Sequence, residues 1–299
     1  MSKIGFIGLG NMGAPMALNL MKAGHDVGCF DVSQDAREAA KSAGLSIAQS
    51  NAQAADSADV VILMLPNGNI AVDVVGDILS TMAPGSLLID CSTIDVTSAK
   101  KIHALAETAN IMCLDAPVSG GVGGASAGSL TFMVGGMAQA FEKGSPLFDV
   151  MGQKAVHCGD GSGGQAAKIC NNMLLGISMI GTCEAFLMAD KLGLSKSALF
   201  DVLSTSSGSC WSVNTYCPVP GVGPESPADN GYKAGFAAAL MLKDLSLAQD
   251  AAQNSDAPTP LGRHAQMIYQ AMSDAGQGGE DFSSVIRFLK SHQSKEIDR

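Results

Sequence analysis

A short strand, a glycine-rich turn and a helix open the chain, and this arrangement constrains its fold more than any other feature. The strand pattern covers Lys3–Ile7, the turn reads Gly8-Leu-Gly-Asn-Met-Gly13, and a helical pattern covers Ala14–Ala23. Gly8 permits a tight turn, Gly10 lets a ligand approach the backbone, and Gly13 lets the helix pack closely on the strand. The spacing predicts the first unit of an α/β fold with a ligand at its turn.

The residues around this turn indicate which ligand it takes. The amino end of a helix favours negative charge, so a pyrophosphate fits beside Gly10, Asn11 and Met12. A second strand pattern, Asp26–Phe30, ends directly before Asp31, whose carboxylate is placed to bond the ribose hydroxyls of a dinucleotide. A carboxylate at this place repels a 2′-phosphate. The sequence therefore predicts an NAD site in preference to an NADP site.

Strand and helix patterns then alternate to about residue 157, which predicts a doubly wound, Rossmann-type sheet. The strand patterns are Val60–Leu65, Leu87–Asp90, Ile111–Leu114, Thr131–Val134 and Lys154–His157, and the longer helical patterns are Ile70–Met82 and Val96–Ala109. Ligands in such sheets lie beyond the carboxyl ends of the strands. Leu65, Pro66 and Thr93 follow two of these ends, so they are candidates to contact the cofactor; the alternative is that they are ordinary loop residues.

A glycine-rich segment between two strand patterns is a candidate anion site. It reads Asp115-Ala-Pro-Val-Ser-Gly-Gly-Val-Gly-Gly-Ala125. Backbone N–H groups from Ser119, Gly120 and Gly121 can form a concavity that binds a carboxylate or a phosphate. A flexible glycine loop without a ligand is the alternative.

A long apolar helical pattern, Gln165–Leu192, follows this half of the chain. Between Met173 and Cys183 hardly a polar side chain occurs, which predicts a helix buried on all sides. The apolar run is shorter than the about 20 residues of a membrane span, so we expect no membrane crossing. Lys168 and Asn172 stand one turn apart at its start and share a face. Such a lysine needs partners or a function, unless its head reaches water.

The second half is predicted to be all-helical, giving two domains over residues 1–162 and 163–299. Its other helical patterns are Lys196–Ser204, Phe236–Ser255, Pro260–Ala275 and Phe282–Lys290. Prolines and glycines between Trp211 and Phe236 exclude a helix there and predict a long irregular loop, either functional or disordered. Trp211 can line a small pocket or pack in a core or interface. A second apolar helical run carries Lys243.

Composition narrows the partners and the compartment. The net charge of −10 argues against nucleic acid or an anionic membrane as partner. Eight cysteines without a Cys-x-x-Cys or Cys/His cluster predict buried free thiols in a reducing compartment, and no metal site. A strand begins almost at the first residue, so we expect a cytoplasmic or already processed protein. The five histidines lack companion motifs and are assigned no chemistry.

Four motifs, in order, resemble the β-hydroxyacid dehydrogenase family over essentially the whole chain. They are Gly8-Leu-Gly-Asn-Met-Gly13, Asp115–Ala125, Gly164-Gln-Ala-Ala-Lys-Ile-Cys-Asn-Asn172 and Lys243-Asp-Leu245. The resemblance implies a Rossmann-type domain followed by a helical domain, with Lys168 as the catalytic residue and Asn172 beside it. It also implies contacts from Ser119, Gly120, Gly121 and Trp211 to substrate, and from Leu65, Pro66, Thr93, Phe236 and Lys243 to cofactor or substrate.

Ser206–Trp211, Pro218–Gly221 and Asp281–Ser284 further resemble the branch of this family that oxidises 3-hydroxyisobutyrate. The implied activity is the NAD-dependent oxidation of that acid to methylmalonate semialdehyde, a step of valine breakdown, in a homodimer or homotetramer of the bacterial cytoplasm. A tartronate or succinic semialdehyde reductase, or a broader β-hydroxyacid dehydrogenase, is the alternative. A non-catalytic nucleotide-sensing protein on the same fold is a further one.

Overall fold

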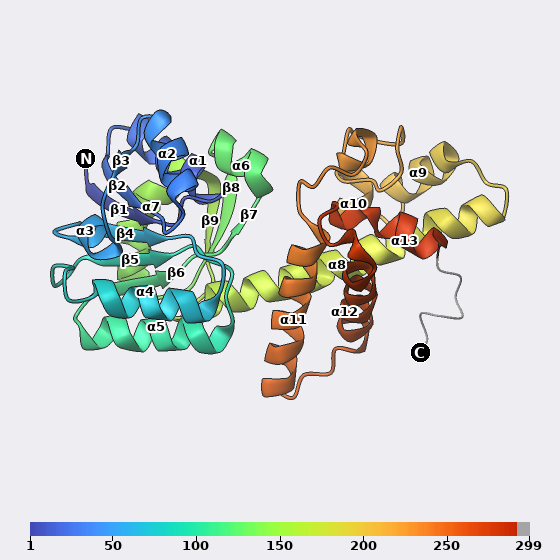
Figure 1. Cartoon of the computed structure of the whole chain (residues 1–299). Helices are drawn as coiled ribbons and strands as arrows, with labels where there is room; N and C mark the ends of the chain where they lie inside the picture. Colours follow the sequence, from blue (N-terminus) through green and yellow to red (C-terminus); the bar gives the residue numbers. More distant parts are fainter. Residues whose placement is uncertain (292–299) are drawn as a thin grey trace. The chain divides into compact units, whose positions relative to one another are not determined.

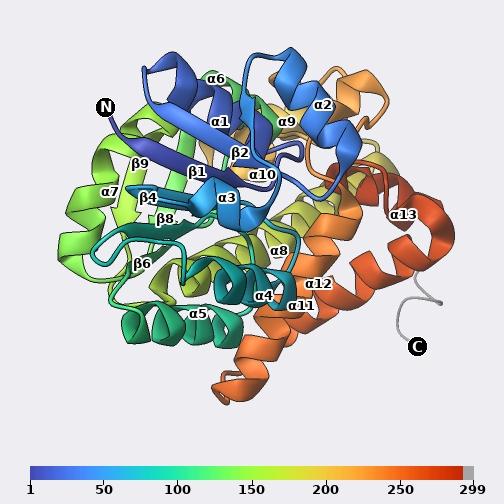
Figure 2. The same ribbon diagram turned by 60° about the vertical axis from the view of Figure 1, so that its left-hand side comes forward.

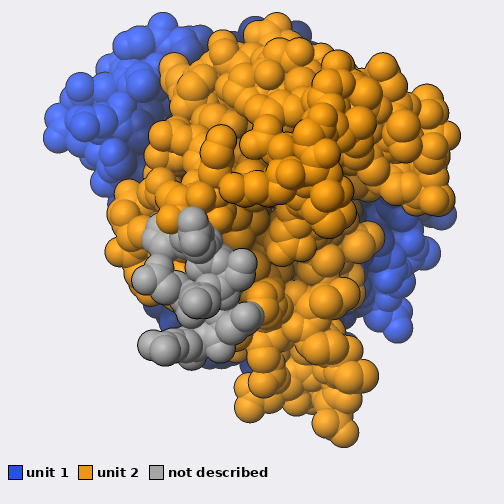
Figure 3. Space-filling model, turned by 90° about the vertical axis from the view of Figure 1, so that its right-hand side faces the viewer, with its two compact units in different colours: residues 1–168 blue, residues 169–299 orange. Residues whose placement is uncertain are grey.

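A computed structural model describes residues 1–291 of the chain, which form two compact units (Figure 3). Unit 1 comprises Met1–Lys168, and unit 2 begins at Ile169. The predicted boundary after residue 162 lies at the start of the long helix α8, Gly163–Lys191. His292, to which the sequence assigned no chemistry, lies outside the described residues.

Unit 1 is built on a parallel sheet of six strands, as the alternating pattern predicted (Figure 1). Its strands are β1 Lys3–Ile7, β2 Asp26–Phe30, β3 Ser46–Ile47, β4 Val60–Leu63, β5 Leu87–Asp90 and β6 Met112–Asp115. All four residues of β4 are buried, because a parallel strand is covered on both faces. The spatial order β3-β2-β1-β4-β5-β6 is that of the doubly wound dinucleotide fold, with its switch point between β1 and β4.

Helices cover both faces of this sheet. They are α1 Gly13–Lys22, α2 Gln34–Ser42, α3 Asn51–Ala55, α4 Gly68–Ile78, α5 Val96–Thr108, α6 Gly121–Ala127 and α7 Ala138–Met151. The amino ends of α2 to α5 are set by Ser33, Ser50, Asn67 and Asp95, whose side chains accept the N–H group three residues on. Figure 2 shows α4 and α5 side by side on one face.

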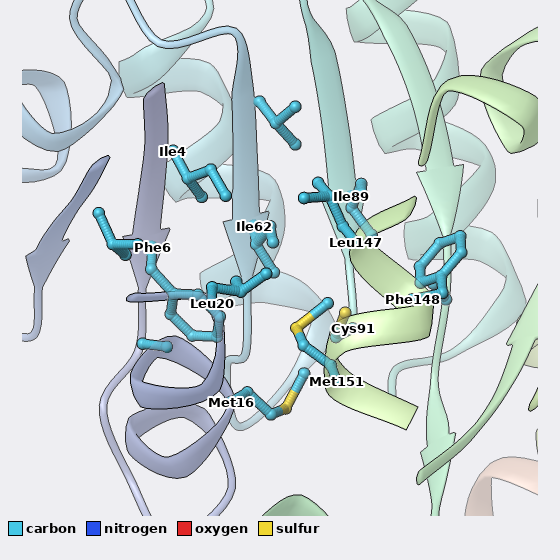
Figure 4. Close-up of a cluster of buried hydrophobic side chains, with 14 of the residues drawn as sticks. Ile4, Phe6, Met16, Leu20, Ile62, Ile89, Cys91, Leu147, Phe148 and Met151 are labelled. Carbon is cyan, nitrogen blue, oxygen red and sulfur yellow. The ribbon is translucent and has the colours of Figure 1, made fainter. Parts of the chain in front are cut away.

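Two separate cores hold these layers together. On one face Phe6 and Ile62 of the sheet pack with Leu20 of α1 and with Phe148 and Met151 of α7 (Figure 4). On the other face, buried side chains of α3, α4 and α5 pack against Ile7, Val61 and Leu88. The helix that follows the glycine turn is therefore fixed to the sheet by its apolar side.

A second, three-stranded sheet completes unit 1. It consists of β7 Val118–Ser119, β8 Leu130–Val134 and β9 Gly152–His157 in the order β7-β8-β9. The sequence predicted β8 and β9 to within two residues but missed β7, as it missed β3. Because β7 pairs antiparallel with β8, it fixes the backbone on which Ser119 lies.

Unit 2 is helical, as predicted. After α8 it contains α9 Lys196–Thr205, α10 Trp211–Asn214, η1 Pro227–Asn230, α11 Ala238–Asn254, α12 Pro260–Met272, η2 Ser273–Gln277, η3 Phe282–Ser284 and α13 Val285–Ser291. Its core joins Met179 of α8 to Met241 and Leu245 of α11 and to Ile268 and Tyr269 of α12.

One expectation for α8 was wrong. The helix is not buried on all sides, since Leu174 and Met188 are each 63% exposed in the chain. By length and composition it also reaches the threshold for a membrane-spanning helix, although core helices of soluble proteins pass the same test and 44% of its window is buried in the chain. Sequence hydropathy reports composition and not which neighbour covers each face.

The segment between Trp211 and Phe236 also differs from the expectation that it holds no helix. It contains the single turn α10 and the 3-10 turn η1, with Pro227 at the first position of η1, where a proline needs no N–H partner. Asp229 accepts hydrogen bonds from the N–H groups of Gly221 and Ser226, and the pKa of its carboxyl is lowered by these bonds. The loop is therefore pinned by its own side chains.

All eight cysteines are free, as expected, but not all of them are buried. Cys170 on α8 is exposed, and Cys158 and Cys210 are partly exposed. Among the buried thiols, burial raises the pKa of Cys29 to about 12, so it stays protonated at neutral pH.

Candidate active site

The glycine turn after β1 has the geometry that a closely bound pyrophosphate needs. Gly8 has a φ of 99°, and a Cβ there would lie 2.2 Å from the carbonyl oxygen of Met64. A Cβ on Gly13 would lie 1.9 Å from the carbonyl oxygen of Gly8. A Cβ on Gly10 would meet nothing within 4 Å, so this glycine faces open space. Gly8 and Gly13 thus shape the turn, and Gly10 leaves room for a ligand, as the fingerprint requires.

Asp31, at the carboxyl end of β2, is held in a fixed orientation. Its Oδ2 atom accepts the N–H of Leu9 at 2.6 Å, and its Oδ1 atom accepts the N–H of Ser33 at 2.8 Å. A carboxylate oxygen has two lone pairs, so each oxygen retains capacity for one ribose hydroxyl. The glycine turn and the ribose-binding candidate are therefore joined directly through Leu9.

Arg37 is the first arginine after Asp31, and its guanidinium is already engaged. Its Nη1 atom donates to the carbonyl oxygens of Asp31 and Val32, and the group lies over the ring of Phe30. These contacts stabilise the backbone around Asp31. They hold the guanidinium on main-chain oxygens, which supports the preference for NAD that the Asp31 carboxylate gives.

The loops after β4 and β5 are connected through Ser92, which the sequence did not single out. Its Oγ atom accepts the N–H of Leu65 at 2.8 Å. Its carbonyl oxygen accepts the side-chain amide of Gln165 at 2.7 Å. Leu65 and Thr93, two predicted cofactor contacts, are thus brought to one edge of the sheet, beyond the carboxyl ends of β4 and β5.

Two carboxylates and a histidine lie at the same edge. Asp90 and Asp115 are paired in the register of β5 and β6, and both are buried. Burial, together with the charge of Asp115, raises the pKa of Asp90 to about 6, although hydrogen bonds from Ser92 and the charge of His103 act to lower it. Nε2 of His103, a histidine to which the sequence assigned no chemistry, lies 2.9 Å from Oδ1 of Asp115.

Asp115 anchors the amino end of α8. It accepts the N–H of Ser162 at 2.7 Å on Oδ1 and that of Gln165 at 2.8 Å on Oδ2. A negative charge at this end of a helix is favoured by the helix dipole. A carboxylate far away in sequence therefore fixes where α8 begins.

Lys168 lies in the second turn of α8 and is only 7% exposed. Its Nζ atom donates to the carbonyl oxygen of Val118 at 2.9 Å. Val118 is followed by the predicted carboxylate site, where Gly120 and Gly121 have φ values of 133° and 62°. These positive φ values turn the chain from β7 into α6. The structure thus brings the ammonium group to the strand that carries Ser119.

In unit 2 the structure joins Asn172 to the helix that carries Lys243. Asn172 is buried, and its Nδ2 atom donates to Oδ2 of Asp244. Its Oδ1 atom accepts the side-chain amide of Asn171 at 2.9 Å. The oxygen and the nitrogen of the Asn172 amide are therefore both hydrogen-bonded. Asp244 sets the orientation of this amide, and it directly follows Lys243 on α11.

Trp211 is 49% exposed and stacks on Tyr216, with ring centroids 4.8 Å apart. The hydroxyl of Tyr216 donates to Asp281, a fully buried carboxylate that also accepts the N–H groups of Gly235 and Phe236. Burial, with the Asp281 charge, raises the pKa of Tyr216. Asp281 therefore ties both ends of the proline-rich loop together, a role that no sequence pattern predicted.

Among residues 1–291, no three His, Cys, Asp or Glu side chains are placed to hold a metal ion. The groups that sequence reasoning missed are Ser92, Gln165 and Asp281. The sequence offered one signal for Gln165, which is its place in the Gly164–Asn172 motif. A polar amide at a buried position of a helix needs hydrogen-bond partners.

Two family models cover most of the chain. Residues 3–159 match the NAD-binding domain of 6-phosphogluconate dehydrogenase, and residues 161–289 match the NAD-binding domain of NADP-dependent 3-hydroxyisobutyrate dehydrogenase. A Mycobacterium tuberculosis protein named "probable 3-hydroxyisobutyrate dehydrogenase" is 49% identical over 97% of this chain and 98% of its own. An NAD-dependent L-serine dehydrogenase of Pseudomonas aeruginosa is 47% identical over 99% of this chain and 100% of its own.

A solved structure is equally similar. The 3-hydroxyisobutyrate dehydrogenase of M. tuberculosis, determined with L-serine, matches at a TM-score of 0.94 with 49% identity, covering 97% of this chain and 99% of that one. Together with the glycine turn, Asp31 and the doubly wound sheet, these matches identify the chain as an NAD-dependent oxidoreductase that belongs to the β-hydroxyacid dehydrogenase family.

Proposed function

We propose that this enzyme oxidises 3-hydroxyisobutyrate to methylmalonate semialdehyde with NAD⁺, using Lys168 as general acid and base. The observation that carries the proposal is the buried ammonium of Lys168, hydrogen-bonded to the Val118 carbonyl one residue before Ser119. Relatives that bear the name of this activity align along nearly the whole chain, which supports the substrate assignment.

The reaction removes a hydride from the hydroxyl-bearing carbon and a proton from its oxygen. NAD⁺, when bound, supplies the hydride acceptor. In its neutral amine form Lys168 takes the hydroxyl proton in the oxidation, and as the ammonium it returns that proton in the reverse reduction. The hydrogen bond to the Val118 carbonyl holds its Nζ atom in place beside the strand that carries Ser119.

The remaining residues orient the substrate. Backbone N–H groups at Ser119, Gly120 and Gly121 bind its carboxylate, so that the reacting carbon has one defined direction. Asn172, whose amide is fixed by Asp244, holds the hydroxyl in line with the lysine. Trp211, Phe236 and Lys243 complete the contacts to substrate and cofactor.

L-Serine is the second candidate substrate. It shares the carboxylate and the primary β-hydroxyl of 3-hydroxyisobutyrate and differs in bearing an ammonium in place of a methyl group. One relative is named for its NAD-dependent action on L-serine, and the solved relative was determined with L-serine. Reduction of tartronate semialdehyde or of succinic semialdehyde is the alternative within the family, and a substrate panel separates it from the two candidates above.

We further propose that the enzyme is a homodimer or homotetramer of the bacterial cytoplasm, working in valine breakdown. The free cysteines fit a reducing compartment. Large apolar side chains are exposed on the helices of unit 2, which fits assembly through this unit. They are Leu174, Met188, Val202, Leu240, Leu261 and Met267.

The test is a kinetic panel of 3-hydroxyisobutyrate, L-serine, glycerate and 4-hydroxybutyrate, with NAD⁺ and with NADP⁺. The highest kcat/KM is expected for 3-hydroxyisobutyrate with NAD⁺. The Lys168→Ala variant should lose on the order of 10²-fold or more in kcat, as expected for general acid–base catalysis. Lys191→Ala, in the last turn of the same helix, is the control and should keep its activity. Near-normal turnover by Lys168→Ala would exclude the proposed role.

A further inference from the structure

Gln165 is a polar residue three positions before Lys168, and none of its surface is exposed. Its Oε1 atom accepts the N–H of Ile94 at 3.1 Å, and its Nε2 atom donates to the carbonyl oxygen of Ser92 at 2.7 Å. The two partners flank Thr93. The Gln165 amide therefore forms hydrogen bonds to the backbone on both sides of Thr93, a residue predicted to contact the cofactor.

The same residue lies on the helix that carries the proposed base. Gln165 and Lys168 are three positions apart on α8, so they share a helical face. The backbone N–H of Gln165 is itself fixed on Asp115. Movement of the loop around Thr93 relative to Lys168 is thus limited by two hydrogen bonds of a single side chain.

The connection extends one loop further. Ser92, whose carbonyl oxygen binds Gln165, also accepts the N–H of Leu65 on its hydroxyl. Leu65 follows β4 at the switch point of the sheet. Hydrogen bonds through Ser92 therefore connect the loops after β4 and β5 to the amino end of α8.

We propose that Gln165 is a positioning residue for hydride transfer: it sets the distance between the Thr93 loop, against which the cofactor lies, and the ammonium of Lys168. This inference rests on the proposed role of Lys168. Only a side chain with one donor and one acceptor at this length satisfies both partners. A displacement of about 1 Å between reacting groups lowers rates by about 10²-fold, so two lost bonds are enough to be measured.

The first test is a double-mutant cycle with Gln165→Met, which keeps the length and removes both hydrogen bonds, and Lys168→Ala. Gln165→Met should lower kcat on the order of 10- to 100-fold. Its Kd for NADH, followed by fluorescence, should change less than about threefold, because the Gly8–Gly13 turn and Asp31 are untouched. In the Lys168→Ala background the same substitution should cost less than about threefold, since a residue acting through Lys168 has nothing left to position.

Equal losses in both backgrounds, or an unchanged kcat in Gln165→Met, would overturn the inference while leaving the role of Lys168 intact. Normal turnover of the Lys168→Ala single variant would instead reject the proposed function. Tyr269→Phe is the matched control, because it removes one buried hydrogen bond, to the carbonyl of Phe282, from the core of unit 2. It should lower the melting temperature and leave kcat within about twofold of the wild type.

The second test uses Gln165→Glu and remains informative if Gln165→Met does not fold. An ionised carboxylate has no hydrogen for the Ser92 carbonyl, but a protonated carboxyl restores one donor and one acceptor. The titratable groups around it are Asp115 on β6, which accepts the N–H of residue 165, Asp90 and His103, which interact with Asp115, and Lys168 on α8. The ratio of variant to wild-type kcat should rise at least threefold from pH 8 to pH 5.5. A ratio that stays flat over this range contradicts the positioning role.

Discussion

Replacing Asp90 by asparagine should remove a pH-dependent loss of stability from unit 1. Asp90 is 1% exposed, its Oδ1 atom accepts the N–H of Ser92, and its Oδ2 atom has no hydrogen-bond partner among the described residues. Burial, helped by the Asp115 charge, raises its pKa from 3.8 to about 6. A raised carboxyl pKa means that the folded state binds the proton more tightly than the unfolded state does.

The sign and size of the pH effect on stability follow from this shift in the pKa of Asp90. Between about pH 4 and pH 6 the folded protein binds more protons than the unfolded chain, so stability falls as the pH rises through this window. A pKa shift of about two units corresponds to about 3 kcal/mol in the free energy of unfolding, and this contribution is lost in full above pH 7. Asparagine has no charge to bury. The free energy of unfolding of Asp90→Asn, minus that of the wild type, should therefore increase by about 3 kcal/mol from pH 4 to pH 7.

Urea unfolding at pH 4, 5, 6, 7 and 8 measures this difference. Far-UV circular dichroism follows both units, whereas the fluorescence of Trp211, the sole tryptophan, reports on unit 2. Asp77→Asn, which changes an exposed carboxylate of unit 1, is the control and should show a much smaller pH-dependent difference. A difference between Asp90→Asn and the wild type that does not depend on pH would refute the reasoning.

Three further substitutions test other parts of the structure. Asp31→Asn combined with Val32→Arg should shift the ratio of kcat/KM for NADP⁺ over NAD⁺ upward by at least about tenfold, because a charge that repels the 2′-phosphate is replaced by one that attracts it; an unchanged ratio argues against the Asp31 assignment. Gly13→Ala should abolish measurable NADH binding in a fluorescence titration, since its Cβ would lie 1.9 Å from the Gly8 carbonyl oxygen. Asp281→Ala leaves the N–H groups of Gly235 and Phe236 without their acceptor and should lower Tm by roughly 10 °C in calorimetry.

The parts of the fold that the sequence predicted are those with a strong local pattern. Continuous apolar runs marked β1, β4 and β5, and turn glycines with a following acid marked the dinucleotide unit. The two-residue strands β3 and β7 have no periodicity of their own and exist because a longer neighbour pairs with them. The sequence did not predict the exposure of Leu174 and Met188, because a strong apolar pattern does not reveal which faces of a helix are covered.

The residues of the candidate site also fall into those with a local sequence pattern and those without one. Gly8, Gly13 and Lys168 stand in sequence motifs, so the sequence singled them out as candidates. Ser92 and Gln165 act through backbone groups that are far away in the chain. Their roles depend on the register of β4, β5 and β6, which is a property of the folded sheet and leaves no local pattern.

That register also explains why one edge of the sheet can serve two purposes. It aligns Ile7 of β1 with Leu63 of β4, and Asp90 of β5 with Asp115 of β6. The first pair is uncharged, and it ends at the switch point where an anionic pyrophosphate has to approach. The second pair is acidic, and Asp115 draws in the positive end of the α8 dipole, which carries Lys168 only one turn beyond the anchored N–H of Gln165. If the two pairs were exchanged, the acidic pair would repel the pyrophosphate of the cofactor, and α8 would lose the carboxylate that holds its amino end. The order of the strands and the position of Lys168 therefore depend on the same distribution of charge.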